Sequence, residues 1–189
     1  NMKYVTPDLE SERLILKKGI FDDYRKVYEF DFTKLRDING EFKFVKLEDK
    51  DILGFDTYSS EYDCVYDWII YLKNGMPIGN IVADREDDNL HSIELSFNLH
   101  PNYWGCGYMK EACIIVMDYL FERGYSYVIC GYSEGNIKSQ KLNNKIGFEV
   151  YKVEKDSWEK DGQLITDYKT IISKDRFYEL YKCQSKVKG

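Results

Sequence analysis

The segment 93–120 constrains the fold of this 189-residue chain more than any other part of it. Ile93–Leu99 alternates strictly between apolar and polar residues, which indicates a half-buried β-strand. Two glycines, Gly105 and Gly107, follow it, and apolar residues then recur every three or four positions from 109 to 120. The segment therefore predicts a strand that leads through a glycine turn into an amphipathic helix.

The remaining pattern predicts antiparallel strands before this segment and alternating strands and helices after it. The predicted strands are 13–16, 64–72, 78–83, 93–99, 127–130, 148–153 and 164–172, and the predicted helices are 21–30, 109–120 and 136–145. Residues 31–63 show no sustained period, and we expect a broken helix with a long loop that forms an acceptor-side flap. We expect a mixed α/β fold in one domain over residues 2–183, with a disordered tail at 184–189.

Composition excludes several classes of function. A net charge of -6 argues against a nucleic-acid footprint, and no apolar run is long enough for a membrane helix. The five cysteines are scattered and include no Cys-x-x-Cys pair, so we expect reduced thiols in a cytoplasmic protein. His91 and His100 have no ligand spacing around them, and we therefore predict no metal site.

The glycine turn between strand and helix is the candidate ligand site. Glycines let the backbone approach a ligand, and the first amides of a helix favour an anion such as a phosphate. A P-loop is excluded because Tyr108 and Met109, not Lys and Ser or Thr, follow Gly107. A dinucleotide fingerprint is excluded because Lys110 replaces its third glycine and the preceding strands are antiparallel. Coenzyme A remains, with a purely structural glycine turn as the alternative.

Three separated segments together resemble the GNAT superfamily of acetyltransferases, in particular the branch that contains the ribosomal-protein N-terminal acetyltransferases. Ser11–Leu16 is similar to the opening strand motif of that branch, and Tyr103–Tyr108 with Glu111-Ala112 is similar to its pyrophosphate turn. Asn136-x-x-Ser139 with Gly147-Phe148 resembles its downstream motif. The superfamily usually has Gln or Arg at the start of the turn, where this chain has Asn102.

The resemblance implies a GNAT-like fold, with a mostly antiparallel sheet splayed at the cofactor site and helices on both faces. It implies acetyl-CoA as the donor, with the pantetheine arm between the strand ending at Leu99 and the strand containing Val128. Asn136 would then contact that arm, although it also suits a helix N-cap. The expected cofactor-binding residues are Leu99, Asn102, Tyr103, Trp104, Gly105, Cys106, Gly107, Tyr108, Asn136 and Ser139.

Amide formation from a thioester needs a base, an oxyanion donor and a proton for the leaving thiolate. Alternation in 93–99 places Glu94 opposite the apolar face, so Glu94 is the predicted base, directly or through water, unless it is only a solvated or ion-paired residue. A backbone N–H near Leu99 is the predicted oxyanion donor. Many relatives in the superfamily carry a tyrosine as proton donor where this chain has Asn143, so the resemblance favours Ser139, whose alternative is a helix-surface serine. Cys106 and Cys130 have no histidine partner in a recognisable motif, which favours direct transfer over a cysteine nucleophile.

The predicted activity is acetyl transfer to a primary amine, with a protein N-terminus, a polyamine or an aminoglycoside as the acceptor. Acidic residues in 31–63 could attract such a cation, although a solvated acidic loop fits them as well. The predicted acceptor-lining aromatics, which could also be core residues, are Tyr28, Phe30, Phe32, Tyr58 and Trp158. The alternatives are an acyl-CoA-binding sensor on the same fold and a purely structural interaction domain, and the resemblance makes a homodimer possible.

Overall fold

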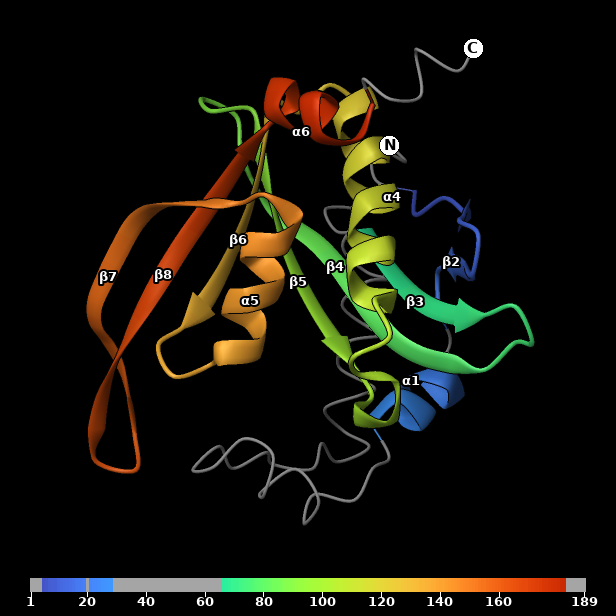
Figure 1. Cartoon of the computed structure of the whole chain (residues 1–189), viewed down its shortest axis with the longest axis horizontal. Helices are drawn as coiled ribbons and strands as arrows, with labels where there is room; N and C mark the ends of the chain where they lie inside the picture. The colour runs from blue at the N-terminus through green and yellow to red at the C-terminus, as the bar shows by residue number, and fades with distance from the viewer. Residues whose placement is uncertain (1–4, 20, 29–65, 183–189) are drawn as a thin grey trace. The chain divides into compact units, whose positions relative to one another are not determined.

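The computed structural model describes residues 5–19, 21–28 and 66–182. Its elements are β1 (Leu9–Glu10), β2 (Leu14–Lys17), α1 (Phe21–Tyr28), β3 (Tyr66–Leu72), β4 (Pro77–Asp87), β5 (Ser92–Leu99), the 3-10 helix η1 (Pro101–Tyr103), α4 (Tyr108–Glu122), β6 (Tyr127–Ser133), α5 (Ile137–Ile146), β7 (Glu149–Lys160), β8 (Gln163–Ser173) and α6 (Lys174–Tyr181). Hydrogen bonding follows the strand order β1-β2-β3-β4-β5-β6-β8-β7 (Figure 1). Strand β5 pairs with β6 in parallel, whereas β1–β2, β2–β3, β3–β4, β6–β8 and β7–β8 are antiparallel. The predicted mixed α/β class with a mostly antiparallel sheet is confirmed.

The chain divides into two compact units. Unit 1 comprises residues 1–84 and 97–115, and unit 2 comprises residues 85–96 and 116–189. Strands β4 and β5 and helix α4 therefore each contribute to both units. The single domain predicted for 2–183 stays a prediction.

The core of unit 1 is built on β3. Every residue from Tyr66 to Tyr71 is buried, and in β2 the alternate residues Leu14 and Leu16 are buried against it. Trp68 stacks on Tyr66 at 5.5 Å between ring centroids, and its indole N–H donates to the carbonyl of Pro7 over 2.8 Å. This satisfied indole lets a large aromatic side chain lie fully inside the unit.

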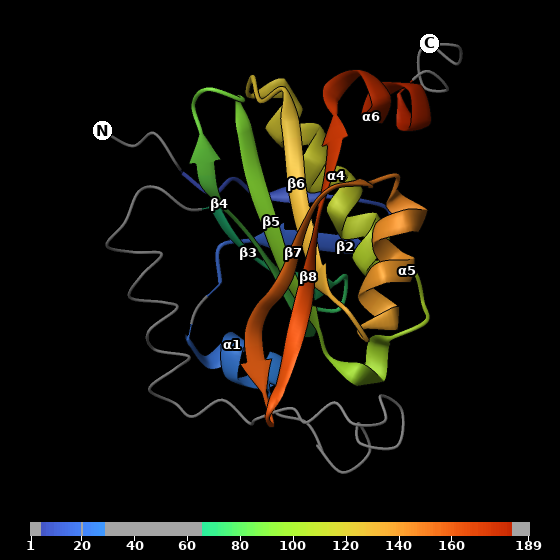
Figure 2. The ribbon, with the colours of Figure 1, turned by 90° about the vertical axis from the view of Figure 1, so that its left-hand side faces the viewer.

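Unit 2 packs helices against β6 and β8. Phe121, near the end of α4, contacts the buried Phe177 of α6 at 5.2 Å between ring centroids, and Figures 1 and 2 both show α6 beside that end of α4. The elements predicted from sequence end at residue 172, so helix α6 was missed. The Ser173 side chain accepts from the N–H of Arg176 over 3.1 Å, and this N-cap begins α6.

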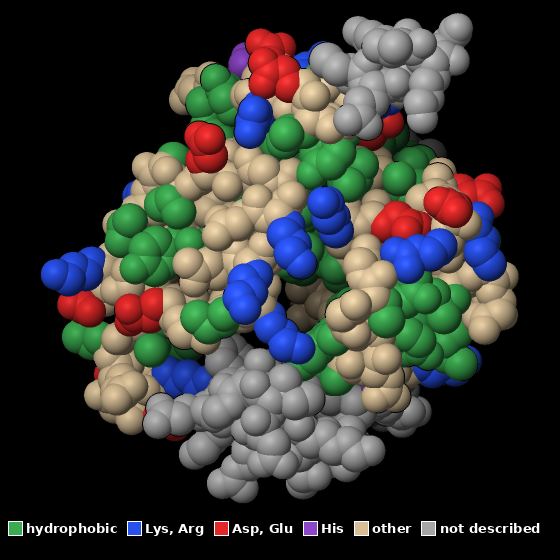
Figure 3. All heavy atoms as spheres, viewed as in Figure 1, with side chains coloured by type: hydrophobic (Ala, Val, Ile, Leu, Met, Phe, Trp, Pro, Cys, Tyr) green, Lys and Arg blue, Asp and Glu red, His purple; other side chains and the backbone are tan. Residues whose placement is uncertain are grey.

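The β7–β8 hairpin is longer than the sequence predicted. Strand β7 was expected to end at 153 but continues to Lys160, with an irregular register between Glu154 and Trp158. Exposed hydrophobic side chains, including Val150, Val153 and Leu164, gather over this hairpin (Figure 3). Strand β7 lies last in the strand order, so no other described strand pairs with its outer edge. In the described part of the chain, no helix is long and apolar enough to cross a membrane.

Candidate functional site

Hydrogen bonds within unit 1 hold the first part of the turn between β5 and α4, ahead of Gly105 and Gly107. The N–H of His100 donates to the carbonyl of Ile78 over 2.8 Å, and the His100 ring accepts from the N–H of Asn102 over 3.1 Å. The indole N–H of Trp104 donates back to the carbonyl of Leu99 over 2.8 Å. The turn is therefore held both by β4 and by hydrogen bonds of its own side chains.

The backbone N–H groups of the turn fall into two sets. Those of Asn102, Tyr103 and Trp104 donate to atoms of His100 and Pro101 within the turn, so the first predicted donors are already used. No described residue accepts a hydrogen bond from the N–H groups of residues 105–110. Residues 105–107 are exposed, so water can bond to their N–H groups and an external acceptor can take its place.

The conformation of the free set suits an anion. Gly105 and Gly107 have φ angles of +78° and +79°, whereas Cys106 between them is not among the positive-φ residues. Alternating signs of φ turn successive N–H groups toward one side and form an anion-binding concavity. Helix α4, 15 residues long, begins at Tyr108 and adds the positive end of its dipole. These residues therefore fit the pyrophosphate of coenzyme A.

Arg13, just before β2, and Glu111 on α4 form a carboxylate–guanidinium pair that supports this turn. Glu111 accepts from the hydroxyl of Ser11 over 2.6 Å, from the backbone N–H of Arg13 over 3.0 Å and from Nε of Arg13 over 2.7 Å. Arg13 Nη1 also donates to the carbonyl of Cys106 over 2.9 Å. These contacts could not be predicted from sequence pattern, because about a hundred residues separate the partners.

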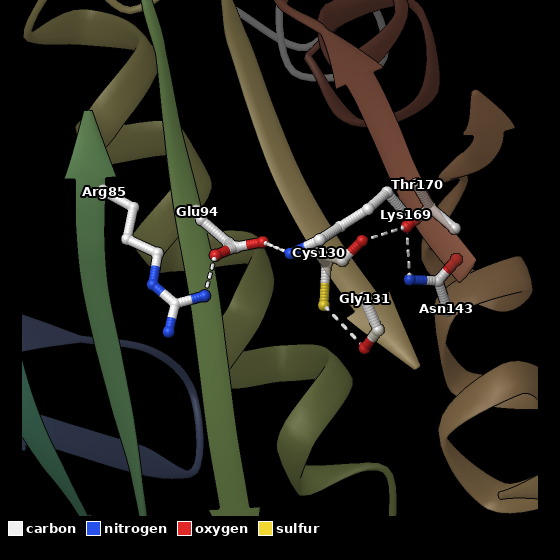
Figure 4. Close-up of polar contacts among 7 residues, drawn as sticks. All are labelled: Arg85, Glu94, Cys130, Gly131, Asn143, Lys169 and Thr170. Atoms are coloured by element: carbon white, nitrogen blue, oxygen red, sulfur yellow. Dashed lines mark hydrogen bonds and ion pairs between the residues drawn. The ribbon is translucent and has the colours of Figure 1, made fainter. Parts of the chain in front are cut away.

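Glu94, the predicted base, lies in an ion-pair cluster in unit 2 (Figure 4). Its carboxylate accepts from Arg85 Nη1 over 3.0 Å and from Lys169 Nζ on β8. Its side chain is only 10% exposed, whereas that of Arg85 is 72% exposed. The expected alternation in β5 begins only after Leu95, because the residues from Ser92 to Leu95 are all buried. The cluster matches the ion-paired alternative for Glu94, and neither cation was singled out from sequence.

On the opposite face of the same strands, a buried polar network surrounds Cys130 (Figure 4). The hydroxyl of Thr170 donates to the carbonyl of Cys130 over 2.8 Å and accepts from Asn143 Nδ2 over 2.7 Å. Asn143 is only 2% exposed. Burial raises the pKa of the Cys130 thiol to about 12. The position at which many relatives carry a tyrosine thus holds a buried structural amide.

Asn136 and Ser139 lie at the start of α5, as predicted. Asn136 Oδ1 accepts from the N–H of Ser139 over 3.3 Å, so the predicted N-cap is present. No described residue bonds to Asn136 Nδ2 or to the hydroxyl of Ser139. Nearby in unit 2, the parallel ladder of β5 with β6 ends at Leu95 and Cys130, although β6 continues to Ser133.

Of the predicted acceptor-lining aromatics, only Trp158 has a described side chain. Its indole N–H donates over 3.0 Å to Asp167, which also accepts from the hydroxyl of Ser133 over 2.6 Å. Phe30, Phe32 and Tyr58 lie outside the described residues, as does the side chain of Tyr28. Among the described residues, no cluster of His, Cys, Asp and Glu could hold a metal ion.

A protein family and several solved structures match this chain. Residues 13–149 match the family described as acetyltransferase (GNAT) domain. Comparison with curated protein sequences gives no match. The solved structures that share the fold include a GNAT-family acetyltransferase from Bacillus anthracis, with 21% identity over 89% of this chain and 99% of that chain, and a TM-score of 0.74.

Two further structures are a ribosomal-protein-S5-alanine acetyltransferase from Vibrio fischeri and the microcin C7 self-immunity acetyltransferase in complex with acetyl-CoA and AMP. The first has 16% identity over 90% of this chain and 98% of that chain, with a TM-score of 0.70. The second has 14% identity over 86% and 93%, with a TM-score of 0.68.

The family match, together with the shared fold, defines an acyltransferase. Because the family match spans more than half of the sequence, the chain belongs to the GNAT acetyltransferase family, whose acyl donor is acetyl-CoA.

Proposed function

We propose that this enzyme acetylates a primary amine by direct attack of the amine on the thioester of acetyl-CoA. The observation that carries the proposal is the set of backbone N–H groups from Gly105 to Tyr108, at the start of α4. No described residue accepts a hydrogen bond from them. They would bind the pyrophosphate, as helix N-termini bind anions. The acceptor would be a protein N-terminus or a small cationic amine.

Two features of unit 2 support binding of the pantetheine arm. Bound acetyl-CoA supplies the thioester, and its pantetheine arm carries amide groups that can pair with a strand edge. Residues 131–133 of β6 extend beyond the ladder with β5 and would offer that edge. Asn136 would donate from Nδ2 while Oδ1 remains the cap of α5.

Glu94 would accept the proton of the amine, directly or through water. Its carboxylate is nearly buried, which suits a base that works away from bulk solvent. Arg85 and Lys169 hold the same oxygens, so proton transfer to Glu94 must compete with both cations. A backbone N–H near Leu99 remains the proposed oxyanion donor, and Ser139 remains the proposed proton donor to the thiolate. The positive end of the α5 dipole would favour loss of a proton from Ser139.

Direct transfer is favoured over a cysteine nucleophile. A thiol attacks as the thiolate, and burial raises the pKa of Cys130 to about 12. Cys106 is exposed in the turn, but its proposed neighbours are phosphate-binding amides rather than a base. Neither thiol therefore combines access with activation.

Trp158 and Asp167 support a cationic acceptor. The carboxylate of Asp167 and the half-exposed indole of Trp158 lie in direct contact, and an ammonium group can bind to both kinds of surface. Strand β7 lies last in the strand order and exposes Val150 and Val153, which supports the homodimer that the resemblance makes possible. Cys106 and Cys130 are free thiols, which supports a cytoplasmic location.

The second candidate is an acyl-CoA-binding sensor without efficient transfer. It is favoured by the buried Asn143 at the tyrosine position and by the ion pairs that occupy Glu94. The test is to follow thiol release from acetyl-CoA with a panel of peptides, polyamines and aminoglycosides. Release that needs an amine and falls about 100-fold in Glu94→Gln supports catalysis. Tight acetyl-CoA binding without turnover on any amine would favour the sensor.

A further inference from the structure

The opening strand motif and the glycine turn, far apart in sequence, meet in one network within unit 1. The carboxylate of Glu111 takes three hydrogen bonds, from the hydroxyl of Ser11 and from the backbone and side chain of Arg13. The guanidinium of Arg13 lies over the ring of Tyr108, 4.4 Å from its centroid, and donates to the carbonyl of Cys106. The Arg13 side chain thus contacts both the glycine turn and the first turn of α4.

The bond to the carbonyl of Cys106 has a directional consequence. A trans peptide unit is planar, so its C=O and N–H point in opposite directions. Arg13 holds the carbonyl of Cys106, and the N–H of Gly107 in the same peptide unit must therefore point away from Arg13. With glycine on both sides of Cys106, little else restrains this peptide from flipping.

The charge of Arg13 is already neutralised at this position. Glu111 bonds to Nε over 2.7 Å, so the pair as a whole carries no net charge toward an anion. Arg13 donates through two different nitrogens, which a lysine cannot reproduce because its ammonium is a point charge. Geometry, rather than attraction, is therefore what the pair contributes.

We propose that Arg13 and Glu111 are positioning residues that fix the direction of the Gly107 N–H and thereby set the affinity for the pyrophosphate of coenzyme A. This inference rests on the proposed function, because it takes the free amides of the turn as the pyrophosphate site. Glu111 acts through Arg13, and Arg13 acts through the Cys106–Gly107 peptide.

The experiment compares Arg13→Lys and Glu111→Gln with the unaltered protein, using coenzyme A as the ligand. Calorimetry gives the Kd, and the amide ¹H–¹⁵N resonance of Gly107 reports the direction and environment of the peptide. Both variants should raise the Kd about tenfold and shift the Gly107 resonance before ligand is added. Glu10→Gln is the matched control, since it removes an exposed ion pair with Lys73 in the same unit and should change neither readout.

Glu111→Gln separates positioning from attraction. It frees the cation of Arg13, so attraction alone would tighten coenzyme A binding, whereas loss of positioning weakens it. The inference is overturned if either variant keeps the original Kd, if Glu111→Gln binds more tightly, or if the Kd rises without a shift at Gly107. If the unaltered protein does not bind coenzyme A, the proposed function fails instead.

Discussion

At the scale of single residues, Gly105 adopts a backbone conformation that other residues avoid. Its φ is +78°, and an added Cβ would meet no atom within 4 Å, so Gly105→Ala changes strain without causing a clash. A left-handed alanine costs about 1–2 kcal/mol, which the turn can relieve by flipping. We expect calorimetry to show at least about tenfold weaker coenzyme A binding.

Gly75 provides the matched control for this prediction. It has a φ of +91° in the β3–β4 turn, again with no atom within 4 Å of an added Cβ. Gly75→Ala should lose similar stability but retain its coenzyme A affinity. If Gly105→Ala and Gly75→Ala bind coenzyme A with equal affinity, the turn is not the coenzyme A site.

Cys106 and Cys130 should differ in reactivity. Cys106 is exposed within the turn, whereas Cys130 is buried with a pKa raised to about 12. We expect iodoacetamide near neutral pH to label Cys106 and leave Cys130 unmodified, as peptide mass spectrometry can measure. Coenzyme A should slow labelling of Cys106, because the ligand covers its neighbours. Unchanged labelling at saturating coenzyme A contradicts the proposed site.

At the scale of elements, Asn143 fastens α5 to β8 through Thr170. Asn143→Tyr places a larger side chain at a position that is 2% exposed, so overpacking should lower the free energy of unfolding by about 2 kcal/mol. We expect no gain in turnover, because the ring has no room to reach a thiolate. The exposed neighbour Asn144 gives the control, with a change within about 0.5 kcal/mol for Asn144→Tyr. A stable, faster Asn143→Tyr enzyme would show that this site can accept a tyrosine donor.

The contact of Ser11 and Arg13, which precede β2, with Glu111 on α4 should depend on pH. Burial raises the pKa of Glu111, but hydrogen bonds from Ser11 and Arg13 outweigh it and hold this pKa below its ordinary value. A lowered carboxyl pKa stabilises the fold above the unfolded pKa, about 4.3, and the stabilisation is lost as pH falls through the folded pKa.

Denaturant unfolding of Glu111→Gln checks this sign. The free energy of unfolding of this variant should fall below that of the unaltered protein by the largest amount near neutral pH, and the difference should shrink in acid. It should be no more than about 1 kcal/mol, because the pair is partly exposed. The exposed Glu12 serves as control, because Glu12→Gln should give no such trend. A deficit that grows in acid would contradict the assigned pair.

The sequence pattern predicted those elements whose conformation depends mainly on residues close together in the chain. The strand 93–99, the glycine turn and the buried face of α4 follow from alternation, positive φ and helical spacing, and each is present. Helix α6 was missed because its N-cap at Ser173 and one buried side chain, Phe177, give little periodic signal. The site residues that depend on distant partners could not be found in this way. Lys169 reaches Glu94 only because β8 lies beside β6, and Arg13 reaches Glu111 only through tertiary packing.

At the scale of the whole molecule, the family match and the fold agree on an acetyl-CoA-dependent acyltransferase. What remains proposed is the set of cofactor-binding residues, the acceptor and the groups that move protons. Each of these proposals presupposes that acetyl-CoA is bound at the proposed turn. Binding at the turn between β5 and α4 is therefore the central claim.

A crystal structure of the complex with coenzyme A tests this claim most directly. The N–H groups of residues 105–108 should lie about 3 Å from pyrophosphate oxygens, with Arg13 still bonded to the carbonyl of Cys106. A pyrophosphate bound elsewhere, with these amides bonded to protein atoms instead, would contradict it.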